Sequence, residues 1–184
     1  LDGGCLDDQR LWVTTSLRGL ASGTLTVEVL TEGVHSGEAS GVVPSSFRIL
    51  RQLLDRVEDS ATGAVLVPEC HAEIPADRVR QARAVTAGFP DAGGGIFPWV
   101  EGVQPMSADP TEQLLSRSWR PTLSVTGADG LPPTGRAGNV LRPSTSLRLS
   151  FRLPPTCDSS AALAAIRDRL LADPPSGARV TFTH

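Results

Sequence analysis

The chain has 184 residues, enough for one domain or for one domain with a large insertion, and 40% of them are hydrophobic. Its net charge of −3 excludes the strongly basic surface that binds nucleic acid or an anionic membrane. No apolar run approaches the roughly 18 residues that span a bilayer, so the sequence predicts no transmembrane helix.

The first third of the chain is predicted to hold two strands and a helix. Leu11–Leu17 is rich in β-forming residues, and Thr24–Leu30 alternates apolar with polar residues, which is typical of a half-buried strand. Residues 19–23 begin and end with glycine, which predicts a hairpin turn between the two strands. Apolar residues at helical spacing predict a helix over Pro44–Glu58, with Pro44 in its first turn.

Residues 68–118 are predicted to form a long irregular insertion. Six prolines and three consecutive glycines interrupt this stretch, and a compact domain rarely contains so long a loop without a purpose. Two short helices are expected inside it, near Ala76–Ala87 and Asp109–Ser116.

Regular structure is predicted again after the insertion. Thr122–Val125 and Ser146–Leu153 alternate as strands do, Ser159–Ala172 has helical periodicity with Asp158 or Ser159 as its cap, and Arg179–Thr183 is a last strand. This order predicts an α+β fold, namely a ferredoxin-like antiparallel four-stranded sheet with two helices on one face, plus the insertion.

The sequence contains few groups arranged for catalysis. Its three histidines lack the spacing of metal ligands, and no GxSxG, P-loop or GxGxxG motif is present. The three cysteines are odd in number and show no CxxC spacing, which favours a reducing, cytoplasmic compartment over a disulfide framework.

One segment has the composition of a binding loop. Residues 34–41 read Val-His-Ser-Gly-Glu-Ala-Ser-Gly and lie between a predicted strand and a predicted helix. Small residues and two glycines there let the backbone and the His35 imidazole approach a ligand closely. A loop histidine that caps a nearby carbonyl group explains the same residues, so both interpretations stay open.

Several short motifs then occur in a fixed order. These are Leu17-Arg18-Gly19 with His35-Ser36-Gly37, then Arg120-Pro121-Thr122-Leu123, then Asn139-Val140 thirteen residues before Arg152, and last Phe151-Arg152-Leu153-Pro154. In this order they resemble the lid, or dimerisation, domain of the M20 (carnosinase-like) zinc metallopeptidases, from Asp2 to His184. Two departures, Ser40 in place of a glycine and Leu141-Arg142-Pro143 in place of Ile-Pro, concern the substrate more than the fold.

The resemblance implies roles for four residues. His35 matches the lid histidine that reaches into the partner subunit's active site and helps to hold the scissile carbonyl oxygen. Arg120 matches an arginine that grips the terminal carboxylate of the substrate, Asn139 matches a polar substrate contact, and Asp2 stands where a metal ligand would be. By themselves, the residues also allow a surface salt bridge for Arg120, a turn for Asn139 and a solvated charge for Asp2.

The resemblance also implies a parent enzyme, a dipeptidase with two zinc ions that acts on peptides as a homodimer. The family's metal-binding histidines, bridging aspartate and general-base glutamate have no counterparts here. We therefore expect residues 1–184 to be one lid domain of a longer protein, because the chain also begins at Leu1 without a methionine. Alone, it is expected to hydrolyse nothing and to bind zinc only weakly.

Two other functions remain open at this point. The same lid occurs in N-acyl-amino-acid deacylases and desuccinylases of the family, and the length of the insertion favours the dipeptidase. From another class, a stand-alone ferredoxin-like oligomerisation module fits the predicted fold. For any dimer, an exposed sheet element is expected to pair, with Thr24–Leu30 and Pro44–Glu58 as the likeliest contacts.

Overall fold

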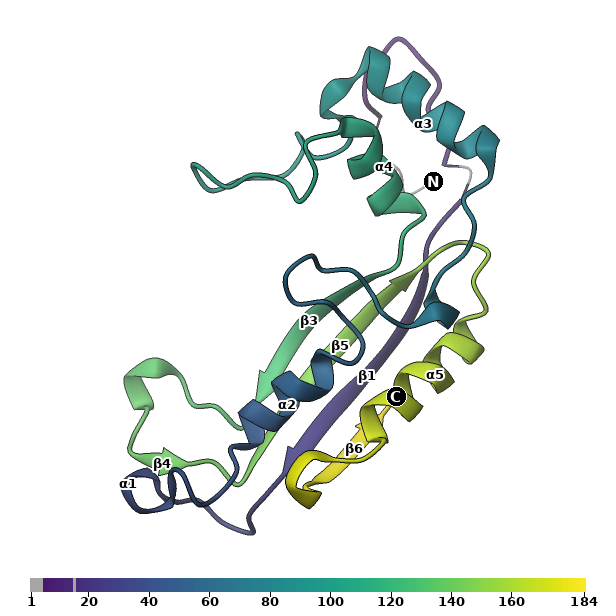
Figure 1. Cartoon of the computed structure of the whole chain (residues 1–184). Helices are drawn as coiled ribbons and strands as arrows, with labels where there is room; N and C mark the ends of the chain where they lie inside the picture. Colours follow the sequence, from purple (N-terminus) through teal and green to yellow (C-terminus); the bar gives the residue numbers. More distant parts are fainter. Residues whose placement is uncertain (1–4, 15) are drawn as a thin grey trace.

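The computed structural model describes residues 5–14 and 16–184, and its centre is an antiparallel sheet. Its four strands lie in the order β3 (Thr122–Asp129), β5 (Ser144–Leu153), β1 (Gly19–Glu28) and β6 (Arg179–Thr183). Helix α2 (Ser46–Leu54) packs on β1 and β5, and α5 (Ser159–Leu171) packs on β1 and β6, so that both cover one face (Figure 1). This β-α-β-β-α-β arrangement confirms the predicted ferredoxin-like α+β fold.

The central strands β1 and β5 bury every second side chain beneath the two helices. They pair over their whole lengths, from Gly19 opposite Leu153 to Glu28 opposite Ser144. Apart from Gly23 and Thr145, the buried positions carry apolar residues, among them Phe151, which is fully buried. The other face consists mainly of serine, threonine and arginine, with Leu20 and Glu28 beside them, which explains most of the alternation in the sequence.

The two covering helices begin at capping residues. The Asp158 side chain accepts hydrogen bonds from the backbone N–H groups of Ser160 and Ala161 at 2.9 and 3.1 Å, which confirms the predicted cap of α5. Helix α2 is shorter than the predicted range Pro44–Glu58, because it starts after a Ser45 cap and ends at Leu54.

The predicted strand Leu11–Leu17 is wrong for its described residues, which form no regular element. Instead Trp12 lies against Phe89 of the insertion, with ring centroids 5.3 Å apart. The predicted turn at residues 19–23 is also wrong, because these residues belong to β1. Gly23 allows a close approach and not a turn, since the Phe182 ring occupies the space where a Cβ atom would lie.

The predicted dimer contact through Thr24–Leu30 needs the same kind of correction. β1 is the inner strand of the sheet, and residues Thr24–Glu28 pair with β5 on one side and with β6 on the other. The free edges of the sheet belong to β3 and β6. From Ser124 to Asp129, β3 is exposed on both faces.

The insertion forms its own small helical layer at one end of the sheet (Figure 1). Helices α3 (Ala76–Gly88) and α4 (Pro110–Ser118) pack on each other and confirm the two predicted helices. Their core is small, with Ala82, Leu115 and Trp119 as its buried members. Short 3₁₀ turns flank α3, namely η1 (Pro68–Cys70) and η2 (Pro90–Ala92).

Short elements lie at the opposite end of the sheet. They are β2 (Val34–His35), α1 (Ser36–Ala39), η3 (Thr134–Arg136) and β4 (Val140–Leu141), while η4 (Pro175–Gly177) precedes β6. Within residues 5–14 and 16–184, none of the helices has the length and apolar character needed to cross a bilayer.

Candidate functional site

Two of the predicted site residues, His35 and Asn139, lie next to each other. β2 and β4 pair antiparallel in a separate two-stranded sheet, with His35 opposite Val140. The backbone N–H of Ser36 donates a hydrogen bond to the Asn139 carbonyl oxygen at 2.9 Å. This pairing brings the two residues together at the α1 end of the main sheet (Figure 1).

The His35 side chain is exposed, and its ring lies over Gly37. A Cβ atom at position 37 would lie only 2.9 Å from His35 Cε1, so glycine leaves the space that the imidazole occupies. Among the described residues, no side-chain hydrogen bond of His35 to a carbonyl group is present, although the sequence left a carbonyl cap open. The ring is therefore accessible to a group from outside this chain.

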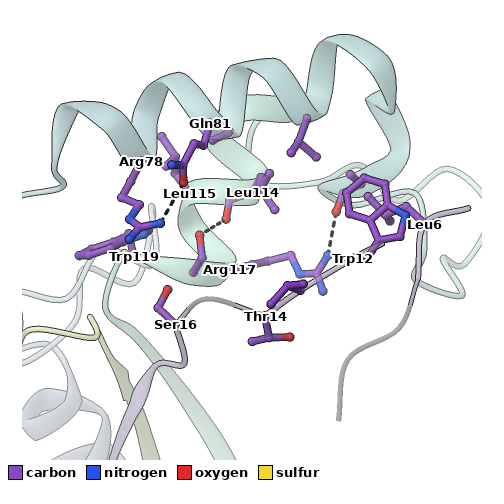
Figure 2. Close-up of a pocket in the computed structure, with 15 residues that line it drawn as sticks. Leu6, Trp12, Thr14, Ser16, Arg78, Gln81, Leu114, Leu115, Arg117 and Trp119 are labelled. Carbon is purple, nitrogen blue, oxygen red and sulfur yellow. Dashed lines mark hydrogen bonds between the residues drawn. The ribbon is translucent and has the colours of Figure 1, made fainter. Parts of the chain in front are cut away.

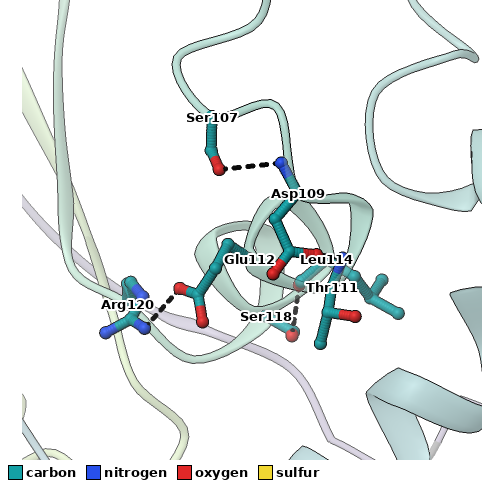
Figure 3. A network of polar contacts seen from close by, with 7 residues as sticks. All are labelled: Ser107, Asp109, Thr111, Glu112, Leu114, Ser118 and Arg120. Atoms are coloured by element: carbon teal, nitrogen blue, oxygen red, sulfur yellow. Dashed lines mark hydrogen bonds and ion pairs between the residues drawn. The ribbon is translucent and has the colours of Figure 1, made fainter.

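Arg120 lies at the other end of the main sheet, between α4 and β3. Its Nη2 donates to Glu112 Oε2 at 2.5 Å, and both side chains are close to half exposed (Figure 3). The salt bridge that the sequence left open for Arg120 is thus present. Such a partly exposed pair contributes little to stability, and it leaves other guanidinium donors of Arg120 free to face solvent.

More arginines lie close to Arg120, around Arg18, and the sequence patterns assigned them no role as a group, although Arg18 and Arg152 belong to two of the short motifs. Arg18 Nη1 donates to the Ser116 carbonyl oxygen and to Thr122 Oγ1, both at 3.2 Å. Burial lowers the pKa of Arg18, and the nearby charges of Arg152 and Arg117 lower it further. No spacing in the sequence indicates this group, because its members come from distant segments that only the fold brings together.

Two pockets of similar size lie in and beside the insertion. One, of about 430 Å³, lies between the N-terminal segment and helices α3 and α4, where Trp12, Leu115 and Trp119 line it (Figure 2). The other, of about 440 Å³, lies beside Arg120 and is lined mainly by apolar atoms.

The described residues do not form a metal site. Within residues 5–14 and 16–184, no three His, Cys, Asp or Glu side chains are grouped so that they could hold a metal ion. His71 is engaged structurally, with its Nε2 2.7 Å from the Val65 carbonyl oxygen. Asp2, the predicted metal ligand, lies outside the described residues.

Comparison with known families places this fold. The family model described as the peptidase dimerisation domain of the M20 group matches residues 15–178. The chain belongs to the M20 peptidase dimerisation domain family. Membership agrees with the motif order from the Leu-Arg-Gly turn to the Phe-Arg-Leu-Pro strand end. No curated protein matches the sequence.

Solved structures of M20 enzymes contain the same fold. The di-peptidase Dug1p from Saccharomyces cerevisiae matches with a TM-score of 0.72 and 22% identity, over 92% of this chain and 36% of its own. Human carnosine dipeptidase 1 matches with a TM-score of 0.72 and 21% identity, over 95% of this chain and 38% of its own. The M20 metallo-carboxypeptidase Sso-CP2 from Sulfolobus solfataricus matches with a TM-score of 0.67 and 16% identity, over 91% of this chain and 38% of its own. The chain thus spans little more than a third of the length of these three proteins.

Proposed function

We propose that this M20 dimerisation domain is the lid of a dipeptidase-like zinc metallopeptidase and supplies His35 to the active site of a partner subunit. The observation that carries the proposal is the separation of the candidate residues, with His35 and Asn139 at one end of the sheet and Arg120 at the other. The zinc ions would be held by Asp2 of this chain together with residues of the rest of the parent.

The length of the sheet supports a role in trans. From Ser144, close to Asn139, to Arg152, opposite Thr122, β5 advances eight residues, or about 25 Å at the usual rise of a strand. A dipeptide spans only about 7 Å. One bound dipeptide therefore cannot touch His35 and Arg120 of the same chain, whereas a two-fold dimer can bring the His35 end of one subunit to the Arg120 end of its partner.

In this proposal His35 stabilises charge in the transition state. Its exposed imidazole would donate a hydrogen bond to the scissile carbonyl oxygen as negative charge develops there. Asn139, held beside it by the β2–β4 pairing, would make a polar contact to the substrate. Arg120 of the other subunit would bind the free carboxylate through donors that Glu112 does not use.

Substitution of His35 in the full-length parent enzyme tests this role. His35→Ala should lower kcat by about 10²–10³-fold with KM little changed, because the lost donor acts mainly on the transition state. Glu38→Ala, an exposed position on the neighbouring helix α1, is the matched control and should leave kcat unchanged. If kcat is unchanged in His35→Ala, His35 is only a structural residue of its loop and takes no part in the reaction.

Mixed dimers test the trans arrangement. Combining His35→Ala subunits with subunits inactivated in the catalytic domain should restore part of the activity, because one site then combines an intact catalytic domain with an intact lid. If heterodimers form and activity does not return, His35 acts on its own subunit or not at all.

We further propose that the homodimer forms through the free edge of β3 next to α2. The support is that β3 is an edge strand, exposed on both faces from Ser124 to Asp129. Val125→Lys should convert a dimer into a monomer in sedimentation experiments, because a lysine at a sheet edge opposes strand pairing. Thr181→Lys on the other edge strand, β6, is the control and should remain dimeric. If Val125→Lys stays dimeric and Thr181→Lys becomes monomeric, the interface lies at β6 instead.

The substrate class has an alternative within the family, an N-acyl-amino-acid deacylase or desuccinylase. The insertion favours the dipeptidase, because it adds a layer of structure beside Arg120 in which a second amino-acid residue could bind. Comparing kcat/KM of the parent for a dipeptide and for the matching N-acetyl amino acid decides between them. A stand-alone oligomerisation module would hydrolyse neither substrate.

We also propose that the parent is cytoplasmic, because the three cysteines are odd in number and show no CxxC spacing.

A further inference from the structure

The larger of the two pockets, here called the insertion groove, has one apolar wall that is open to solvent. Phe97 and Trp99 meet edge to face with centroids 6.0 Å apart, and Met106 lies over Gly63 of the loop that follows α2. These three side chains are between 44% and 85% exposed, although they belong to the residue types that usually form a core. A contiguous exposed apolar surface of this kind is typical of an interaction site.

The apolar wall is held in place by polar contacts. Trp99 Nε1 donates to the Gly94 carbonyl oxygen at 2.9 Å. The Arg117 guanidinium lies 5.2 Å from the Phe97 ring centroid and donates to the carbonyl oxygens of Ala92 and Gly93. The wall is therefore preformed and does not need an occupant to assemble it.

The insertion groove reaches the beginning of the edge strand β3. Pro121 and Thr122 line the groove together with the apolar wall, and Thr122 is the first residue of β3. The loop that precedes α4 projects outward on the side of the sheet where β3 is the edge strand (Figure 1). A molecule that pairs with the free edge of β3 therefore lies next to the groove.

A second apolar segment follows the other end of β3. The strand ends at Asp129, Gly130 turns the chain with a φ of +88°, and Leu131 follows with 48% of its surface exposed. Pro133 has φ −53° and ψ 144°, which is the polyproline II conformation. Leu131 and Pro132 each precede a proline, which restricts both to extended conformations. The segment is thus stiff, and extended proline-rich segments dock on aromatic grooves because they lose little entropy on binding.

The length of β3 keeps this segment away from the groove of its own chain. From Thr122 to Asp129 the strand advances seven residues, or about 23 Å at the usual rise. A two-fold axis at the β3 edge reverses the situation, because the first residue of one antiparallel strand then lies near the last residue of its copy. The partner's Leu131 would come next to Thr122 and the groove, and the same contact would form twice in the dimer.

We infer that the insertion groove binds the Leu131–Pro133 segment of the partner subunit, with the partner's Leu131 against Phe97 and Trp99. The occupant is set by continuity with the β3 edge and by the match between a preformed apolar wall and a stiff, exposed apolar segment. The inference rests on the proposed dimer through β3, and it gives the insertion a role in association that pairing of the edge strands does not explain. The contact does not use Arg120.

The dissociation constant of the dimer tests the contact without any catalytic reaction. In sedimentation equilibrium of the 184-residue chain, Leu131→Ala should weaken the dimer at least about tenfold, because buried apolar surface is lost in both contacts. Met106→Ala should also weaken it. The double variant should lose less than the product of the two single effects, because both substitutions act on one contact. Leu20→Ala is the matched control, since Leu20 is 52% exposed on the inner strand β1, and it should change nothing.

Cross-linking between unlike subunits tests the arrangement directly. In a background with the exposed Cys5 changed to serine, Met106→Cys subunits would be mixed with Leu131→Cys subunits and oxidised with diamide. The mixture should give a covalent dimer, whereas either variant alone should not, because the two-fold axis keeps identical positions apart. Leu20→Cys in place of Leu131→Cys is the control and should not cross-link to Met106→Cys.

An unchanged dissociation constant in Leu131→Ala, or equal cross-linking in the mixture and in the single variants, would overturn the inference. A chain that stays monomeric at every concentration would overturn it as well. If Val125→Lys dissociates the dimer and Leu131→Ala does not, the β3 interface stands and the groove contact fails. If Val125→Lys stays dimeric while the mixture cross-links, the groove contact stands and the β3 pairing fails. None of these measurements involves His35, so its proposed role in trans is tested separately.

Discussion

The sheet layer (β1, β3, β5, β6, α2 and α5) and the insertion differ in what stabilises them. Among the described residues, nineteen buried residues form one continuous apolar cluster in and around the sheet layer, whereas three form the core of the insertion. The insertion depends on polar contacts instead, such as the hydroxyl pair of Thr86 and Thr111 at 3.0 Å between α3 and α4. Because apolar burial is the dominant source of stability, the insertion should open at a lower free energy than the sheet layer.

Because of this difference, the residues of the proposed site lie in regions of different local stability. The His35 end belongs to a short two-stranded sheet beside the stable layer, while Glu112, the ion-pair partner of Arg120, lies in the less stable insertion. Regions of low local stability adjust most easily to a ligand. We therefore expect ligands to alter exchange in the insertion more than in the sheet.

The largest expected effect is the loss of the ring at the centre of the sheet layer. Phe151→Ala should reduce the free energy of unfolding of the whole chain by about 3–5 kcal/mol, because the ring is fully buried and its removal leaves a cavity. Urea denaturation followed by far-UV circular dichroism measures this change. A loss below about 1 kcal/mol would mean that the sheet layer does not dominate stability.

A matched change in the insertion should act locally. Leu115→Ala removes a residue that is 3% exposed, and it should lower the opening free energy of α3 and α4 by about 2 kcal/mol. Hydrogen exchange should accelerate at amides of those helices and remain unchanged in β1 and β5. Equal acceleration in both regions would show that they unfold as one unit.

Cys70 lies where the two regions meet, in η1 and against the core of the sheet layer. Burial chiefly raises the pKa of its thiol to about 12, and the nearby Cys157 adds to the rise. Because the folded-state pKa lies above the unfolded value, the contribution to stability is present below about pH 9 and is lost as the pH rises towards 12.

The resulting alkaline loss of stability should be roughly 1 kcal/mol at pH 10, and Cys70→Ala should remove it. Denaturation curves between pH 8 and pH 10.5 for both proteins measure the difference in slope. Parallel curves would mean that Cys70 ionises as freely in the folded state as in the unfolded state.

The smallest effect is expected for Arg117, which holds the loop between α3 and α4 through Ala92, Gly93 and Phe97. Arg117→Gln removes the hydrogen bonds to Ala92 and Gly93 and the contact with Phe97, which should cost about 1 kcal/mol of local stability. Exchange should accelerate only in residues 92–99, and the midpoint of global unfolding should move little. Protection that is unchanged there would mean that Trp99 holds the loop without Arg117.

Elements with strong local signals could be predicted closely from the sequence. The last strand has the predicted bounds Arg179–Thr183, and α5 has the predicted cap because Asp158 acts on N–H groups two and three residues away. The segment Leu11–Leu17 shows the limit of such signals. Its β-forming residues could not reveal that no neighbouring strand is available to pair with them.

The candidate site divides in the same way. The His35 segment could be found from the sequence because its small residues are consecutive. Its pairing with Asn139 and the gathering of Arg117 and Arg152 around Arg18 could not, because each joins segments that are distant along the chain. Alternation and helical spacing are local properties, so the sequence alone determined the ferredoxin-like layer and its buried face. Only the tertiary structure decided which strand is central, which edges are free and which charges meet, since these depend on contacts between distant segments.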